Sequence, residues 1–227
     1  EDVESNKIQA SGLIIRDGDV LPSNYRSNNS LGNYLKENNI IAIQGLDTRA
    51  IVRLLTKEGA MNGIISSNNM DIKKMQLLLQ QHPSMEGKDL AKVVTCEKSY
   101  YLNRGKYKRK VVVIDYGIKS NILNLLTKQK LELIVLPANS TTNQIMKYNP
   151  DGIFLSNGPG DPAAVTYAIE SVKELLKLRI PIFGICLGHQ ILALALGAKT
   201  YKLKFGHRGC NHPVKNLETG TVEITSQ

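Results

Sequence analysis

Cys186 has neighbours that suit a reactive thiol. The apolar segment IPIFG (residues 180–184) leads into it, a helical pattern follows it, and Gly184 and Gly188 stand two positions to either side. This spacing is typical of a nucleophile held at a sharp strand-to-helix turn, where small residues let the backbone pack closely. A helix N-terminus beside the sulfur favours the thiolate, and the Leu187 amide is positioned to hold an oxyanion. A buried core cysteine is the alternative, which we accept for Cys96 and Cys210.

Gln190 lies one helical turn beyond Cys186. Side chains four residues apart share a helix face, so Gln190 is able to reach the same pocket as the sulfur. By spacing alone it is equally a solvated helix residue.

A second candidate segment is the loop SNGPGDP (residues 156–162), which directly follows an apolar strand. Two glycines and two prolines within five residues fix a tight turn, and a turn alone would explain them. A phosphate loop is a poor match because no Gly-Lys-Ser/Thr follows. The functional alternative is that Gly158 and Gly160 let backbone amides approach a substrate with no Cβ in the way.

Alternating strands and helices position both segments. We expect strands at 111–115, 131–136, 152–156 and 180–184, and helices at 118–128, 142–148, 164–178 and 187–196. Repeated β-α-β units predict an α/β fold with a doubly wound, mainly parallel sheet. Ligands bind at the carboxyl ends of the strands in such sheets, where both candidate segments fall.

The first part of the chain predicts a smaller α/β unit. Strands are expected at 12–16, 40–43 and 64–65, and helices at 31–37 and 71–81. A further helix is expected between Asp47 as its N-cap and Gly59 as its C-terminal stop. The predicted organisation is a smaller domain over 1–97, a basic linker over 98–110, and a sheet domain over 111–227.

The basic segment 98–110 carries five Lys and Arg residues between 104 and 110, interleaved with tyrosines. Aromatic and basic residues together are able to bind single-stranded nucleic acid, so an RNA-binding module is one alternative. No RNA-binding motif accompanies them, and a solvated linker is favoured.

Composition argues against a membrane-spanning protein and against a fold held by a disulfide framework. The 227 residues are 42% hydrophobic and carry a net charge of +9, and no apolar run approaches the length of a membrane span. Three scattered cysteines favour a reducing compartment over a disulfide framework. The chain begins at Glu1 without a signal-like pattern.

Taken together, GICLGHQ and SNGPGDP resemble the signature of the class I glutamine amidotransferases. Four further segments are similar to the small subunits of carbamoyl-phosphate synthetase, so the resemblance runs over essentially the whole chain: 23–55, GAMNGIIS (59–66), VIDYGIKSNIL (113–123) and KFGHRGCNHPV (204–214). The implied fold is the flavodoxin-like amidotransferase sheet preceded by the small-subunit N-terminal domain.

The resemblance assigns roles to particular residues. It makes Cys186 the nucleophile that attacks the amide carbon of glutamine, through a thioester intermediate. It places the amides of Leu187 and Gly158 in the oxyanion hole and gives Gly160 and Gln190 to glutamine binding. The family's base is a histidine followed two residues later by a glutamate, and none of His82, His189, His207 and His212 has that partner. We therefore expect a fragment that lacks both ends and is inactive in turnover.

The resemblance also implies partners. L-Glutamine is the expected substrate, and a large synthetase subunit, in a heterodimer or higher oligomer, is expected to use the ammonia for carbamoyl phosphate in arginine and pyrimidine synthesis. No cofactor or metal is expected on this subunit, because ATP, bicarbonate and a divalent metal belong to the large one. Neither a nucleic acid nor a membrane is an expected partner. The expected location is the cytoplasm, or the plastid if organelle-encoded. A stand-alone cysteine hydrolase on the same fold is the second enzyme alternative.

Overall fold

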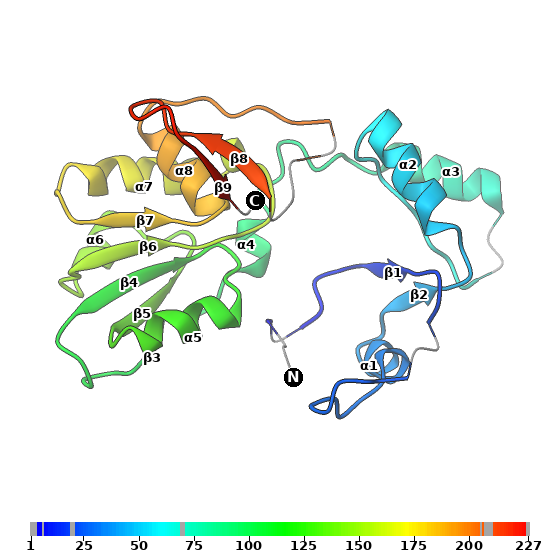
Figure 1. Cartoon of the computed structure of the whole chain (residues 1–227), viewed down its shortest axis with the longest axis horizontal. Coiled ribbons are helices and arrows are strands. Elements are labelled where there is room, and N and C mark those ends of the chain that lie inside the picture. The colour runs from blue at the N-terminus through cyan, green and yellow to red at the C-terminus, as the bar shows by residue number, and fades with distance from the viewer. Residues whose placement is uncertain are drawn as a thin grey trace.

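The computed structural model describes residues 4–5, 7–18, 21–68, 71–204, 206 and 211–225. Two units are apparent in Figure 1, a sheet with its helices on the left and a smaller group of elements on the right. We call residues 91–204 the sheet unit and residues 7–82 the N-terminal unit.

The sheet unit is built on four parallel strands and one antiparallel edge strand. Their order is β3-β5-β4-β6-β7, and β3 is the antiparallel member. The strands are β3 (Tyr100–Leu102), β4 (Lys110–Asp115), β5 (Glu132–Pro137), β6 (Gly152–Leu155) and β7 (Ile182–Gly184). The chain leaves β4 in one direction and returns on its other side at β6, which is the topological switch of a flavodoxin-like sheet. The predicted doubly wound α/β fold is confirmed.

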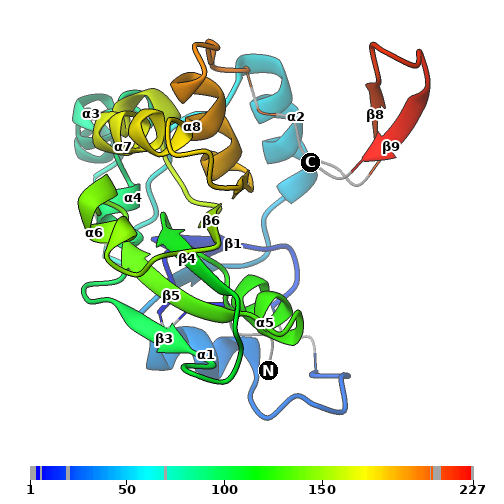
Figure 2. The same cartoon turned by 90° about the vertical axis from the view of Figure 1, so that its left-hand side faces the viewer.

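Helices cover both faces of this sheet. The sheet-unit helices are α4 (Ala91–Val94), α5 (Ser120–Lys128), α6 (Thr142–Met146), α7 (Thr166–Leu176) and α8 (Leu187–Ala195). Residues of α4, α6, α7 and α8 form one core with the sheet, and Leu123 of α5 joins the core on the other face. Figure 2 shows α7 and α8 on the opposite side of β4 and β5 from α5.

The strand sequences explain the two cores. Alternate side chains of a strand point to opposite faces. Accordingly Val112 and Ile114 of β4 pack with the helices of the first core, whereas Val113 packs with α5. All three are at most 2% exposed, so the continuous apolar run of β4 is buried on both faces.

The N-terminal unit contains β1 (Gly12–Ile14), α1 (Leu31–Glu37), β2 (Ile41–Ile43), α2 (Thr48–Glu58) and α3 (Ile72–Gln81). β1 and β2 form a two-stranded parallel sheet. The predicted caps of α2 are present, since Asp47 accepts a hydrogen bond from the Ala50 amide at 3.0 Å and Gly59 ends the helix with φ 103°. No strand forms at Ile64 and Ile65, where the prediction is wrong because no neighbouring strand pairs with them among the described residues.

The predicted basic linker over 98–110 contains β3 instead. Tyr100, Tyr101 and Leu102 pair with β5, and Leu102 packs against the core on the α5 face. The sequence pattern did not predict this short strand, because the basic residues of the turn that follows it dominate the segment. The wider domain boundaries stay a prediction.

The last described residues form a hairpin of β8 (His212–Lys215) and β9 (Val222–Thr225). His207 and Cys210 lie outside the described residues. No helix among the described residues is long and apolar enough to cross a membrane.

Candidate active site

Cys186 lies between the end of β7 and the first residue of α8. Its backbone has φ 50° and ψ −110°, an unusual conformation for a residue with a Cβ. Strained backbone of this kind concentrates at functional sites. The side chain is exposed, so the sulfur is open to a substrate.

Two glycines make this turn sterically possible. A Cβ on Gly184 would lie 2.6 Å from the carbonyl carbon of Gly188, and a Cβ on Gly188 would overlap the carbonyl oxygen of Leu155 at the end of β6. The start of α8 therefore rests directly on the backbone of β6 and β7. This close packing is the physical reason for the glycine on each side of Cys186.

The backbone amides around the cysteine differ in whether they already have an acceptor. The Gly188 amide is in use, because it donates to the carbonyl of Ser156 at 3.0 Å and to that of Ile185 at 2.9 Å. Among the described residues, the amides of Leu187 and Gly158 have no hydrogen-bond acceptor. The two residues are neighbours, because a Cβ on Gly158 would lie 2.8 Å from Leu187 Cδ2. Paired free amides of this kind are what an oxyanion requires.

The loop that carries Gly158 is fixed at its base. Ser156 is fully buried, and its hydroxyl accepts a hydrogen bond from the Tyr116 amide at 2.8 Å. The Asn157 side chain donates to the carbonyl of Gly117 at 3.0 Å. A Cβ on Gly158 would overlap the carbonyl oxygen of Tyr116, so glycine alone fits there. The loop after β6 is thus held against the loop after β4, at the topological switch of the sheet.

The far side of the same loop is clamped by the segment that enters the sheet unit. The Asp161 carboxylate accepts a hydrogen bond from the Gly87 amide at 3.0 Å, and the Asp161 amide donates to the carbonyl of Lys88 at 3.1 Å. Gly160 has φ 99°, and a Cβ there would lie 2.8 Å from the same Lys88 oxygen. Sequence reasoning missed this clamp, because a contact across more than 70 residues leaves no local pattern.

The one remaining predicted site residue lies on the exposed surface of α8. Gln190 is exposed, and its amide donates to the carbonyl of Cys186 at 3.0 Å, so it stands one turn from the thiol as expected. His189 is also exposed. The roles of Cys186, Leu187, Gln190, Gly158 and Gly160 stay predictions.

Cys96 differs from Cys186 in its surroundings. Burial, followed by the nearby Asp115 carboxylate, raises the pKa of the Cys96 thiol to about 11. The thiolate is the nucleophilic form of cysteine, so the raised pKa disfavours reaction at Cys96 at neutral pH. Among the described residues, no group of three or more His, Cys, Asp or Glu side chains is arranged to hold a metal ion.

The fold and this site point to a class of enzymes that activate a cysteine at a strand-to-helix turn. The profile of the glutamine amidotransferase class-I family matches residues 112–227, which is just over half of the chain. The chain belongs to the class-I glutamine amidotransferase family. The profile of the carbamoyl-phosphate synthase small chain, CPSase domain, matches residues 1–65.

Curated relatives agree with both profiles. The chain is 47% identical over 243 residues to the carbamoyl phosphate synthase small chain of Vibrio vulnificus (strain YJ016), covering 100% of this chain and 64% of that protein. It is 50% identical over 228 residues to the small chain of Chlorobaculum tepidum (strain ATCC 49652 / DSM 12025 / NBRC 103806 / TLS), covering 100% of this chain and 62% of that protein. The chain therefore spans less than two thirds of the length of these relatives.

Proposed function

We propose that this chain forms the glutamine-hydrolysing site of a carbamoyl-phosphate synthase small chain. The observation that carries the proposal is an exposed cysteine at φ 50° beside two amides that lack acceptors among the described residues. The Cys186 sulfur attacks the side-chain amide carbon of glutamine. The developing oxyanion accepts hydrogen bonds from Leu187 and Gly158, ammonia leaves, and water hydrolyses the thioester to glutamate.

We infer that the general acid and base of this reaction is not one of the four histidines of the chain. Protonation of the leaving ammonia and activation of water contribute typically about 10²–10⁴-fold. None of the four histidines has a glutamate two residues later. We infer that Cys186 of the 227-residue chain reacts with an alkylating glutamine analogue, whereas glutamine itself is not turned over.

The ammonia is delivered to a large synthetase subunit. Support comes from the small-chain names of the relatives and from the match of residues 1–65 to the small-chain profile. The chemistry described requires no cofactor on this chain. Unpaired Cys96 and Cys186 fit a reducing compartment such as the cytoplasm.

The test is ammonia release from glutamine by a complete small chain that contains this sequence, assembled with its large subunit. Cys186→Ser should abolish release and leave glutamine binding intact, with Cys96→Ser as the matched control that retains activity. A serine variant that hydrolyses glutamine at the unmodified rate would overturn the proposal.

A further inference from the structure

Ser156 is hydrogen-bonded to both halves of the site around Cys186. It directly follows β6 and is 0% exposed. Its amide donates to the carbonyl of Ile114 at 3.1 Å, and its carbonyl accepts from the Gly188 amide at 3.0 Å. Because Gly188 stands next to Leu187, the backbone of Ser156 helps to fix the position of the Leu187 amide. The Ser156 side chain acts on the second amide, which belongs to the loop after β6.

The Ser156 hydroxyl holds one peptide group of that loop in a defined orientation. It donates to the carbonyl oxygen of Asn157 at 2.7 Å and accepts from the Tyr116 amide at 2.8 Å. The Asn157 carbonyl and the Gly158 N–H belong to the same peptide group, which is planar and trans. In a trans peptide these two bonds point in opposite directions. The bond to the buried hydroxyl therefore turns the Gly158 N–H away from Ser156.

The Asn157 side chain supports the same peptide group through a second set of contacts. Its Nδ2 donates to the carbonyl of Gly117 at 3.0 Å, and its Oδ1 accepts from the Lys119 amide at 3.3 Å. Both partners lie in the loop between β4 and α5, so one side chain joins the two loops. Buried Asp115 holds that loop in turn, because it accepts from the amides of Gly117 and Ile118, each at 2.8 Å. The peptide group thus rests on a support that is itself hydrogen-bonded.

Glycine at position 158 makes this support necessary. A Cβ there would overlap the carbonyl oxygen of Tyr116, so the position has no room for a side chain. Glycine populates positive and negative φ about equally, so residue 158 does not itself select an orientation for its N–H. A hydrogen bond to the preceding carbonyl makes that selection before a substrate arrives. An oxyanion donor acts best when it is preorganised in this way.

We propose that Ser156, assisted by Asn157, is a positioning residue that aims the Gly158 amide at the oxyanion. The inference rests on the proposed glutamine-hydrolysing function. Neither side chain is a catalytic residue, because each acts through the Gly158 amide. Loss of the Ser156 hydroxyl lets the peptide group rotate, which weakens a hydrogen bond that is strongest in the transition state. Such a loss lowers kcat and leaves the KM for glutamine nearly unchanged.

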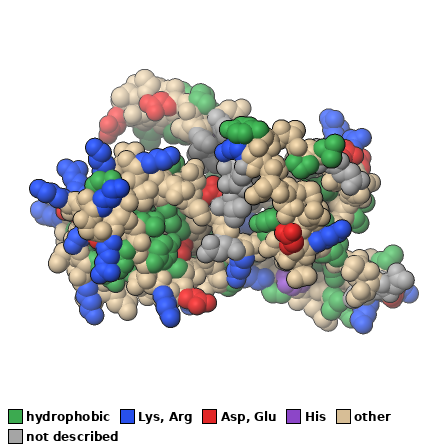
Figure 3. All heavy atoms as spheres, turned by 90° about the horizontal axis from the view of Figure 1, so that it is seen from below, with side chains coloured by type: hydrophobic (Ala, Val, Ile, Leu, Met, Phe, Trp, Pro, Cys, Tyr) green, Lys and Arg blue, Asp and Glu red, His purple; other side chains and the backbone are tan. Residues whose placement is uncertain are grey.

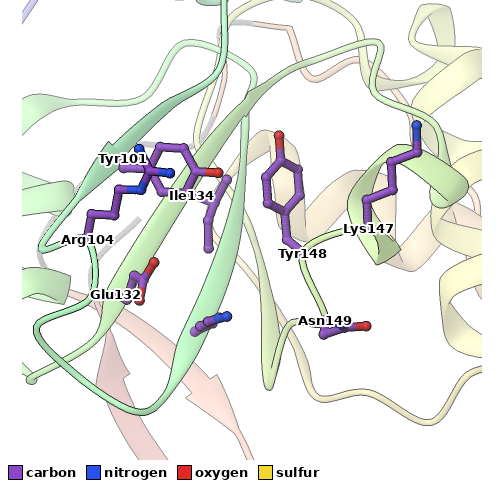
Figure 4. A pocket seen from close by; sticks show the side chains of 8 residues that line it. Tyr101, Arg104, Glu132, Ile134, Lys147, Tyr148 and Asn149 are labelled. Carbon is purple, nitrogen blue, oxygen red and sulfur yellow. The ribbon is translucent and has the colours of Figure 1, made fainter.

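A buried side chain with a comparable task lies at the opposite edge of the sheet. Glu132 is 6% exposed, and its Oε2 accepts from the Gly105 amide at 3.1 Å in the turn between β3 and β4. Glu132 begins β5, whereas Cys186 follows the last residue of β7, and β4 to β7 run parallel. Figure 4 shows Glu132 among the side chains that line a pocket at this edge. Glu132 therefore offers a matched control that is remote from the site.

The test is ammonia release from glutamine by the complete small chain assembled with its large subunit. Ser156→Ala should lower kcat at least about tenfold, since removal of a whole oxyanion donor costs about 10²–10³-fold. Asn157→Ala should lower kcat several-fold. Iodoacetamide requires only the thiolate, so it should alkylate Cys186 of each variant at the unmodified rate. Glu132→Ala should lower the melting temperature but leave kcat unchanged.

Three outcomes would overturn the inference. They are a kcat of Ser156→Ala within about twofold of the unmodified value, an equal loss of kcat in Glu132→Ala, or a change confined to KM. If melting shows that Ser156→Ala is unfolded, Asn157→Ala decides the question, because Asn157 is only half-buried. An unchanged kcat in that variant would then overturn the inference.

Cys186→Ser in the same complex separates this inference from the proposed function. If the serine variant releases ammonia at the unmodified rate, the proposed function fails and the positioning role fails with it. If the serine variant is inactive while Ser156→Ala keeps full activity, only the positioning role fails.

Discussion

The N-terminal unit and the sheet unit use apolar residues in different ways. Of the hydrophobic residues that are buried among the described part of the chain, only Leu35 belongs to the N-terminal unit. α2 and α3 have no buried residue, although each places apolar side chains on one face. Seen from below, Lys and Arg side chains are denser over the sheet half (Figure 3). An amphipathic helix is stabilised when its apolar face is covered, so the sheet unit dominates the folding free energy.

The largest expected effect is at the packing of α8 on the sheet. Gly188→Ala places a Cβ against the Leu155 carbonyl, whose carbon would be 2.5 Å away. Overpacking of backbone on backbone should cost about 3 kcal/mol and lower the melting temperature by about 10 °C. Gly32→Ala in α1 is the matched control, because a Cβ there meets nothing within 4 Å. Its melting temperature should stay the same or rise, as alanine favours a helix. Equal losses of melting temperature in both variants would contradict the stated difference between the sheet unit and the N-terminal unit.

A pair of valines measures the difference in burial directly. Val113 of β4 is 0% exposed, whereas Val52 of α2 is 59% exposed. Val113→Ala should lower the free energy of unfolding by about 2 kcal/mol in urea titrations, because it leaves a cavity in the core. Val52→Ala should change it by less than about 0.5 kcal/mol. A larger loss at Val52 would mean that the α2 face is covered in solution.

The hydrogen bond between the Gly87 amide and the Asp161 carboxylate allows a third test, this time of the loop that carries Gly158. Asp161→Ala removes the acceptor of the Gly87 amide and should cost about 1 kcal/mol. It should also slow the alkylation of Cys186, since the loop loses its outer support. Asp161→Asn keeps an oxygen acceptor and serves as the control. If the Ala variant loses stability but reacts at the unmodified rate, the clamp is structural only.

The smallest effect concerns Cys96 at high pH. Its pKa is raised to about 11, so the folded chain keeps the thiol proton while the unfolded chain loses it from about pH 9 upwards. The stabilisation from this group is complete below about pH 9 and is lost as the pH rises to about 11. Cys96→Ala should therefore lose less stability across this interval in parallel urea titrations. An identical pH dependence in the two proteins would contradict the assigned environment.

Local patterns predicted much of the sheet unit. The apolar run of β4 and the glycines around Cys186 follow from patterns of adjacent residues, and the fold contains both. β3 escaped prediction because its three residues stand beside a run of charges. The contacts of Asp161 and Ser156 escaped because they join distant segments. The position of the turn predicts the amide of Leu187, whereas that of Gly158 was implied only by the family resemblance, and the role of both stays a prediction.

Cysteine labelling tests the central claim, that Cys186 is the nucleophile, most directly. The 227-residue chain would be incubated at pH 7.5 with an alkylating glutamine analogue, and the adduct located by peptide mass spectrometry. The account predicts one adduct on Cys186 that excess glutamine prevents, with Cys96 unmodified because its raised pKa keeps the thiol protonated. An adduct on Cys96 or Cys210, or labelling of Cys186 that glutamine does not slow, would contradict it.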